Sequence, residues 1–209
     1  MYIPEHNAVS DQALLHDLMR RFNFATFVTM HDGSHFATHL PFLVYPDRGD
    51  HGSLVGHMAR ANAQWKDFDQ GVEALVIFQG PHTYISPSWY ETQPSVPTWN
   101  YVVAHAYGVP QLIEDEARVW AILKELVAKH EEGFAKPWRM DNPDDYLRKM
   151  MRGIVAFEIP ITRLEGKFKL SQNRSVRDQS RVVEALAHDP DPDAQRVMAL
   201  MRALIPNER

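Results

Sequence analysis

The N-terminal part of the chain combines one helical pattern with strand-like runs. Ser10 and Asp11 are typical helix-start residues, and the apolar residues after them recur at helical spacing: Leu14, Leu15, Leu18, Met19 and Phe22. A β-branched and aromatic run over 24–30 predicts a strand, and the Asp32-Gly33 pair is typical of a two-residue hairpin turn. The return strand is predicted over 35–45, with Pro41 at an edge or a bulge because proline cannot donate to a sheet ladder.

The middle of the chain continues this strand-rich pattern. A short strand is predicted over 53–58, followed by a short helix over 59–68 whose first turn contains Arg60 and Asn62. A buried strand is predicted over 72–79 and a long strand over 98–107. Gly108-Val109-Pro110 ends that strand before the sheet resumes at 111–113.

From Glu114 onward the apolar period becomes helical. One face is lined by Val119, Ile122, Leu123, Leu126 and Val127, and Gly133 ends the helix. Asn142-Pro143 opens a short helix through Arg152, a strand follows over 154–161, and two helices are predicted over 176–187 and 193–204. About six or seven strands with few helices between them favour a small antiparallel barrel, mainly β with peripheral helices.

A proline-rich and aromatic connection lies between the strands predicted at 72–79 and 98–107. Its prolines are Pro81, Pro87, Pro94 and Pro97. Because proline fixes φ and lacks a backbone donor, this connection is predicted to be stiff and extended. Such a loop suits the wall of a pocket for a flat ligand. A long loop folded over a hydrophobic core explains the same residues equally well.

Composition narrows the function classes. The chain has 209 residues and no cysteine, which excludes disulfides, thiolate metal sites and cysteine nucleophiles. It shows neither a secretory signal nor an apolar run long enough to cross a bilayer, so we expect a cytoplasmic protein without membrane contact. The formal net charge of −5 argues against a surface that coats nucleic acid, although it leaves room for a local basic patch.

Familiar catalytic and metal-binding motifs are missing from the sequence. There is no glycine-rich dinucleotide fingerprint, no P-loop and no nucleophile elbow. His31, His35 and His39 resemble a metal cluster, but residues four apart on a strand are separated by about 13 Å. We therefore predict no metal site.

Two polar segments are candidates for binding an anion. The segment 56–62 runs from a strand into a helix start, where unpaired N–H groups favour an anion and Arg60 adds a fork that matches phosphate. An ordinary capped helix with an exposed arginine is the alternative. The second cluster is Lys167, Lys169, Gln172, Asn173 and Arg174, for which a solvated loop is the alternative. Together with the aromatic connection, these segments describe a pocket for a flat, phosphorylated ligand.

Several longer phrases resemble one family. They are ATHLPFLV (37–44), GHMARANAQW (56–65), LVIFQGPHTYISPSWY (75–90), VPTWNYVVAHAYG (96–108) and KLSQNRS (169–175). In this order, over about residues 1–180, they resemble the PaiB family, described as FMN-binding negative transcriptional regulators. The resemblance implies an FMN-binding split β-barrel similar to the pyridoxamine-phosphate oxidase and flavin reductase group. It also implies a homodimer with FMN in a groove at the subunit interface.

The resemblance implies the following cofactor contacts. Thr38, His39, Leu40 and Pro41 would pass along the isoalloxazine, His57 and Met58 would continue that floor, and Arg60 with Asn62 would hold the phosphate. Tyr84, Trp99, Asn100 and Tyr101 would enclose the ring. Lys169, Gln172 and Asn173 lie where related oxidases keep a basic-polar motif near the flavin. The domain over 1–175 would be the FMN-binding split barrel, with inserted helices over 114–152 and a C-terminal helical extension over 176–209.

Three functional hypotheses follow from the resemblance. The first is an FMN-binding regulator of gene expression, although no helix-turn-helix is evident and the net charge does not favour DNA. The second is a flavin-dependent oxidoreductase or flavin reductase that acts on a small substrate. The third is a haem-binding split barrel. No residue is identified as a catalyst by the sequence.

Overall fold

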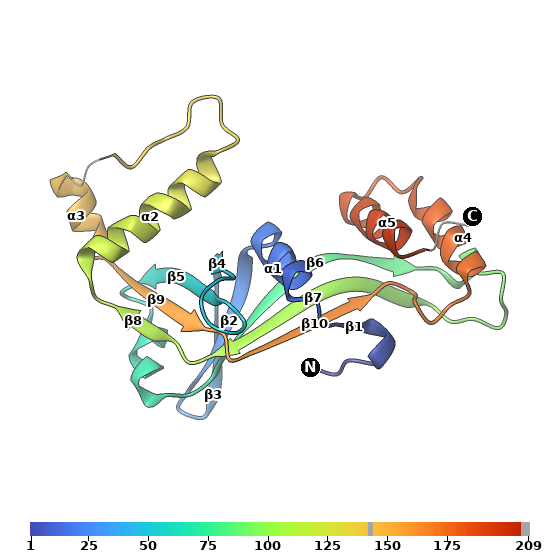
Figure 1. Cartoon of the computed structure of the whole chain (residues 1–209), viewed down its shortest axis with the longest axis horizontal. Coiled ribbons are helices and arrows are strands. Elements are labelled where there is room, and N and C mark those ends of the chain that lie inside the picture. Colours follow the sequence, from blue (N-terminus) through green and yellow to red (C-terminus); the bar gives the residue numbers. More distant parts are fainter. Residues whose placement is uncertain (142–143, 206–209) are drawn as a thin grey trace. The chain divides into compact units, whose positions relative to one another are not determined.

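The computed structural model describes residues 1–141 and 144–205, which form two compact units. Unit 1 combines residues 1–18 and 78–105 with the chain from Glu165 onward, and unit 2 combines residues 19–77 and 106–164. The chain passes between the units within helix α1 (Gln12–Arg21) and within three strands, β6 (Ala74–Ile85), β7 (Thr98–Gly108) and β10 (Arg163–Lys169) (Figure 1).

Unit 1 contains one sheet with strand order β1-β10-β7-β6. Its remaining elements are η1 (Glu5–Asn7), β1 (Ala8–Val9), η3 (Pro87–Trp89), α4 (Val176–Leu186) and α5 (Pro192–Leu204). The two C-terminal helices pack against each other through buried apolar residues such as Val182, Leu186 and Val197. Helix α1 covers the sheet where glycines allow close approach, because Leu15 lies against Gly166 and Leu18 against Gly80.

Unit 2 contains the neighbouring strands β6-β2-β3 of the six-stranded sheet. It also contains a second sheet, of four strands in the order β4-β5-β9-β8. Its strands and helices are β2 (Phe24–His31), β3 (Ser34–Pro41), β4 (Leu43–Tyr45), β5 (Ser53–Ala59), η2 (Ala63–Gln70), β8 (Gln111–Ile113), α2 (Glu116–Glu131), α3 (Asp145–Met151) and β9 (Ile154–Pro160). The strand pairs between β2, β3 and β6 and throughout the second sheet are antiparallel.

Two apolar clusters form the core of unit 2. In the first, the rings of Phe27 and Phe157 stack with centroids 5.2 Å apart, and Phe42 and Phe68 meet them edge-on. In the second, helix α2 packs on the four-stranded sheet β4-β5-β9-β8. The buried residues of this cluster are Leu43, Val55, Ile113, Val119, Ile122, Leu126 and Ala156. Burying each large side chain contributes about 1.5–3 kcal/mol, so these clusters hold the strands that carry several candidate residues.

The predicted first hairpin is confirmed. Strands β2 and β3 pair from Phe24↔Pro41 to His31↔Ser34, and the turn residues Asp32 and Gly33 have φ of 48° and 73°. Positive φ at both central positions matches the twist of the flanking strands. β3 is the last strand of its sheet, so Pro41 lies on an edge strand as predicted.

The single return strand predicted over 35–45 is wrong. The strand breaks at Phe42, so β3 and β4 belong to different sheets. Phe42 is fully buried, and its N–H donates to Asn23 O over 2.9 Å rather than to a sheet ladder. The aromatic core therefore bends the chain at a position where the apolar sequence pattern continues.

The predicted loop after residue 79 is also partly wrong, because β6 continues to Ile85. Alternate residues are buried up to Phe78, and after Gly80 and Pro81 the buried positions shift by one. This is the pattern of a bulge, which accommodates a proline inside a strand. The segment 163–169, for which the sequence predicted no strand, forms β10.

The predicted helices are present with adjusted bounds, except that the one predicted over 59–68 is the 3₁₀ helix η2. Helix α1 is capped by Asp11, whose Oδ1 accepts the N–H of Ala13 over 2.9 Å. Residues 142 and 143, the predicted start of the next helix, lie outside the described residues, and α3 begins at Asp145 after the cap Asp144.

Within the described chain, no helix combines the length and the apolar character that crossing a membrane requires. The division into domains at residue 175 stays a prediction.

Candidate functional site

Asn62 joins the edge strand β3 to the start of η2. Its side-chain Oδ1 accepts the N–H of Gln64 over 3.0 Å, and its Nδ2 donates to Thr38 Oγ1 over 2.9 Å. Asn62 is thus the N-cap of η2, which is a 3₁₀ rather than an α-helix. The structure therefore brings two of the predicted cofactor contacts, Thr38 and Asn62, into direct contact.

Arg60 precedes this cap and does not lie in the first helical turn, which corrects the sequence prediction. Its Nε donates to Arg152 O over 2.9 Å and its Nη2 to Ile154 O over 2.8 Å. The indole of Trp65 donates to Arg60 O over 3.0 Å. A guanidinium has five N–H donors, and these two bonds engage two of them. Arg60 is therefore oriented by backbone carbonyls while its side chain remains exposed.

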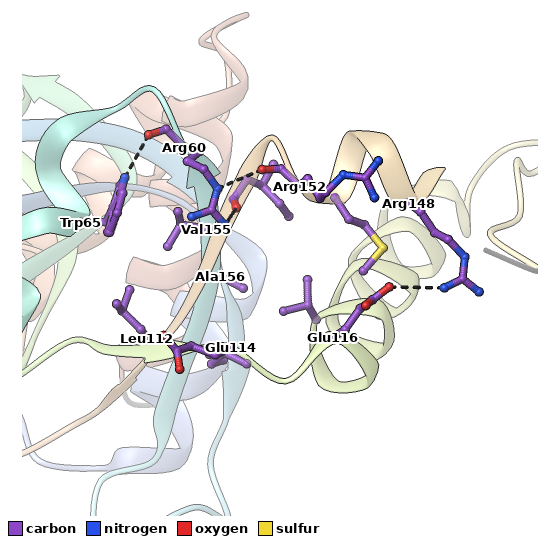
Figure 2. A pocket seen from close by; sticks show the side chains of 13 residues that line it. Arg60, Trp65, Leu112, Glu114, Glu116, Arg148, Arg152, Val155 and Ala156 are labelled. Atoms are coloured by element: carbon purple, nitrogen blue, oxygen red, sulfur yellow. Dashed lines mark hydrogen bonds and ion pairs between the residues drawn. The ribbon is translucent and has the colours of Figure 1, made fainter. Parts of the chain in front are cut away.

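A cavity of about 380 Å³ lies beside Arg60 in unit 2 (Figure 2). Apolar side chains, among them Val119, Val155 and Ala156, form part of its lining, and Trp65 adds an indole ring. Its charged residues have both signs: Arg60, Arg148, Arg152, Glu114 and Glu116. Arg148 and Glu116 pair at 3.5 Å. With three arginines and two glutamates, the lining has one more positive than negative side chain.

His57 carries a buried polar atom that lacks a hydrogen bond. Its Nδ1 is buried and has no partner among the described residues. Burial lowers the pKa of the imidazole below its ordinary value, which favours the neutral ring. An unsatisfied buried nitrogen costs free energy unless a ligand or water provides a partner. The Nδ1 of His57 is therefore a candidate partner for a polar atom of a bound group.

The other predicted residues of unit 2 differ in exposure. Leu40 and Met58 are both 4% exposed, and the Leu40 side chain contacts Gly56, so both residues belong to the core. His39 is exposed, contacts Thr26 Oγ1 through Nδ1 over 3.1 Å and stacks on Phe24. Pro41 ends β3 and is half-buried. Leu40 and Met58 can thus offer a ligand their backbone groups, whereas His39 also presents its ring.

In unit 1, an aromatic face covers parts of β6 and β7. Trp99 lies with its ring centroid 6.2 Å from Tyr84 and 5.9 Å from His82, and both Trp99 and Tyr84 are exposed. Lys167 is 7% exposed, and its Nζ donates to Tyr2 O over 3.1 Å and lies 5.3 Å from the centroid of the Tyr101 ring. The exposed rings can stack on a flat ligand, whereas the Lys167 ammonium is engaged within unit 1. Lys167 belongs to the second polar cluster named from the sequence, whereas His82 was not among the predicted contacts although it lies two residues before Tyr84 on β6.

The polar residues near this face are occupied by structural hydrogen bonds. Lys169 Nζ donates to Thr98 Oγ1 and to Trp99 O, each over 2.5 Å. Burial, and then the charges of Lys167 and Arg174, lower the pKa of Lys169. Gln172 closes a turn between Phe168 and Leu170 with its own side chain. Lys169 and Gln172 thus shape the backbone here, while Asn173 is exposed to solvent.

Asn100 is fully buried in unit 1. Its Nδ2 donates to Ser171 Oγ over 3.0 Å and contacts Met201 Sδ over 3.3 Å, and its Oδ1 accepts from Ser171. Asn100 therefore links β7 to the C-terminal segment. The predicted cofactor contacts divide between the units: those from Thr38 to Asn62 lie in unit 2, and those from Tyr84 to Asn173 lie in unit 1.

The histidines of the first hairpin do not gather into a metal cluster. His31 Nδ1 contacts Asp67 Oδ2 over 2.7 Å, and its ring meets Phe36 edge-on. Across the described residues, no group of three or more histidine, aspartate or glutamate side chains is arranged to hold a metal ion. His31 thus has a hydrogen-bonding role within unit 2.

The fold and the sequence are similar to those of known proteins. Residues 1–163 match the family described as "Putative FMN-binding domain". The chain is 37% identical over 203 residues to "Protease synthase and sporulation protein PAI 2" of Bacillus subtilis, covering 96% of both chains. The FAD and heme binding protein from Mycobacterium smegmatis has a TM-score of 0.60 at 19% identity, over 78% of this chain and 73% of that one. The flavocytochrome Anf3 from Azotobacter vinelandii has a TM-score of 0.61 at 17% identity, over 80% and 72%.

The fold places the chain in the class of split-barrel proteins, mainly β with antiparallel sheets and a few helices. The chain belongs to the FMN-binding family matched over residues 1–163, and within it the chain is a PaiB-type protein. The fold class and the family resemblance predicted from the sequence are therefore confirmed.

Proposed function

We propose that this chain binds FMN, with the phosphate at Arg60 and Asn62 and the isoalloxazine along β3 and β5. The observation that carries the proposal is the β5–η2 junction, where a guanidinium fixed by two carbonyls lies beside a capped helix start. Oriented donors at such a start favour phosphate oxygens. The unpartnered Nδ1 of His57 on the same strand supplies a polar group for the ring system. Bound FMN would supply redox chemistry, while these residues would bind and orient it.

Replacing Arg60 by Ala tests the phosphate contact. A lost charge-assisted contact costs about 1.5–3 kcal/mol, so we expect FMN affinity to fall by roughly 10- to 100-fold. Arg60→Lys keeps the charge without the fork and should give an intermediate affinity. Arg196→Ala, which removes an exposed arginine of α5, is the matched control. Equal FMN affinities for wild type, R60A and R196A, measured by flavin fluorescence titration, would move the phosphate site elsewhere.

We further propose a homodimer with FMN at the subunit interface and with contacts from both chains. The exposed aromatic residues Tyr84 and Trp99 support this assembly, because large exposed aromatic side chains are typical of interfaces and of ligand walls. Light scattering coupled to size-exclusion chromatography should give twice the chain mass, with one FMN bound per chain. A monomer that binds one FMN with unchanged affinity on dilution would contradict the dimer.

The regulatory role is the remaining part of the proposal. The Bacillus subtilis relative is named for protease synthesis and sporulation, and we propose a related role for this chain in controlling gene expression in the cytoplasm. Direct contact with DNA has little support from a net charge of −5. Salt-dependent binding to the DNA upstream of its own gene would support direct regulation. Steady NAD(P)H oxidation by the FMN-loaded protein, without DNA binding, would instead favour the oxidoreductase.

A further inference from the structure

The connection between β6 and β7, residues 86–97, lies against helix α4, which is beyond the segment matched by the family. Both elements belong to unit 1, and Figure 1 shows α4 beside the end of the β6–β7 pair. The sequence suggests that prolines alone stiffen this connection. The contacts show that the C-terminal segment also holds it, and the individual bonds indicate how.

Asp178 is the central contact. It is 1% exposed, and its Oδ1 accepts the backbone N–H groups of Glu91 over 2.8 Å and Thr92 over 3.3 Å. The Asp178 N–H donates to Ser175 Oγ, which caps α4. A buried carboxylate that accepts two main-chain donors recognises the backbone of the loop rather than its side chains. Its position in the first turn of α4 also places the negative charge where the helix dipole favours it.

Three arginines contact the same stretch of loop. Arg181 Nε donates to Trp89 O over 3.0 Å, and Arg177 pairs with the Glu91 carboxylate. The guanidinium of Arg174 lies 4.4 Å from the centroid of the buried Tyr90 ring. Arg177, Asp178 and Arg181 recur at helical spacing and face one side of α4, while Arg174 lies just before the cap Ser175. The helix thus offers donors to a carbonyl and an acceptor to N–H groups of the same loop.

The ends of this loop carry Tyr84 and Trp99, the exposed pair of rings that we call the aromatic wall. Tyr84 lies just before the loop and Trp99 just after it, and their rings are 6.2 Å apart. Two further bonds hold the Trp99 end, because Lys169 donates to Trp99 O and Asn100 bonds Ser171. The loop joins the end of β6 that carries Tyr84 to this fixed end of β7, so movement of the loop would shift Tyr84 relative to Trp99.

We propose that α4 is the positioning element of the aromatic wall, with Asp178 as the positioning residue that fixes loop 86–97 through Glu91 and Thr92. The effect on flavin rests on the proposed FMN function, whereas the effect on the loop does not. Asp178 does not contact the flavin in the proposed site. It acts by keeping Tyr84 and Trp99 in one relative arrangement.

The experiment compares wild type with Asp178→Asn and Asp193→Asn. Asn keeps the shape of the side chain and loses the charge, and Asp193 is an aspartate of α5 that pairs with Arg196. Hydrogen–deuterium exchange is measured first, without flavin. We expect at least tenfold faster exchange at the Glu91 and Thr92 amides in D178N, and no change in D193N. Unchanged exchange in D178N overturns the proposal, whether or not the protein binds FMN.

The second measurement uses FMN as the probe. If wild type binds FMN, D178N should weaken binding about threefold to tenfold and change the visible circular dichroism of the bound flavin, which reports ring orientation. Equal affinity and an equal spectrum, with faster loop exchange, would overturn the link to the wall. Wild type that shows no FMN binding rejects the proposed function instead. If D178N does not fold, Arg181→Gln at an exposed position serves as the second variant, with the same expected directions.

Discussion

Gly108 lies against Pro160 so closely that a methyl group at position 108 would overlap the Pro160 carbonyl. Ile159 lies on the same side, so two neighbouring residues of β9 leave no room for a side chain there. The contact belongs to unit 2 and holds the end of β7 near β9. Gly108 is therefore required by close backbone approach.

Gly108→Ala should lower the free energy of unfolding by about 1–3 kcal/mol, because overpacking forces the backbone apart. Gly133→Ala is the matched control, since a methyl group there would meet nothing within 4 Å and should change stability by less than about 0.5 kcal/mol. Urea denaturation of both variants is the measurement. A G108A variant as stable as G133A would contradict the close approach.

Two substitutions of Asn62 should affect stability and FMN binding differently. Asn62→Ala removes the cap of η2 and the bond to Thr38, and should cost about 0.5–2 kcal/mol of stability. Asn62→Asp keeps the cap acceptor but places a negative charge at the proposed phosphate position. We therefore expect N62D to be more stable than N62A and to bind FMN more weakly, as measured by thermal unfolding and flavin titration. The reverse order of affinities would place the phosphate away from this cap.

Glu158 should contribute to acid sensitivity. Burial opposes its ionisation, but hydrogen bonds from Ser53, Arg118 and Arg48 outweigh that effect and lower the pKa of the carboxyl. A lowered pKa in the folded state means that the unfolded state binds more protons. Its stabilisation is thus present above the ordinary pKa and is lost as pH falls through the lower, folded value.

Glu158→Gln should therefore reduce stability at neutral pH by about 1–3 kcal/mol and flatten the decline of the melting temperature below about pH 5. Glu184→Gln, at an exposed position of α4, is the control and should keep the wild-type profile. Parallel melting curves for wild type and E158Q across the acid range would show that the carboxylate is not stabilised by these partners.

His57 should affect the pH dependence of stability at higher pH than Glu158 does. Burial lowers its pKa in the folded state, so the unfolded state takes up a proton first as pH falls. The contribution of His57 to stability is consequently full above the ordinary histidine value and decreases as pH drops below it. His57→Gln should remove this part of the slope between about pH 7 and pH 5. His188→Gln, an exposed control, should retain the slope, and an unchanged profile in H57Q would contradict burial of a neutral ring.

Much of the secondary structure could be predicted because it depends on local chemistry. The Asp32-Gly33 turn requires positive φ at both positions, and the helical spacing of Val119, Ile122 and Leu126 matches α2. The breaks that were missed have non-local causes. The chain bends at Phe42 because that side chain joins an aromatic core with Phe27 and Phe157, which lie far away in the sequence.

Only part of the candidate site could be predicted from the sequence. The motif around Arg60 and Asn62 pointed to an anion site, and the cap at Asn62 has the expected chemistry. The bond from Asn62 to Thr38, the unsatisfied nitrogen of His57 and the burial of Met58 depend on strand pairing and packing. No spacing rule contains that information, because these contacts join segments that are separated in the sequence.

By itself, the sequence determined the mainly β class, the family and the local turns and caps, because each follows from short-range patterns or long, specific motifs. Only the tertiary structure decided that Arg60 is oriented by carbonyls of residues 152 and 154, and that Asp178 holds the backbone of a loop more than eighty residues earlier. Burial and hydrogen bonding between distant segments set those roles. Both arise when strands and helices pack, so the same residue types could have been ordinary surface charges in another fold.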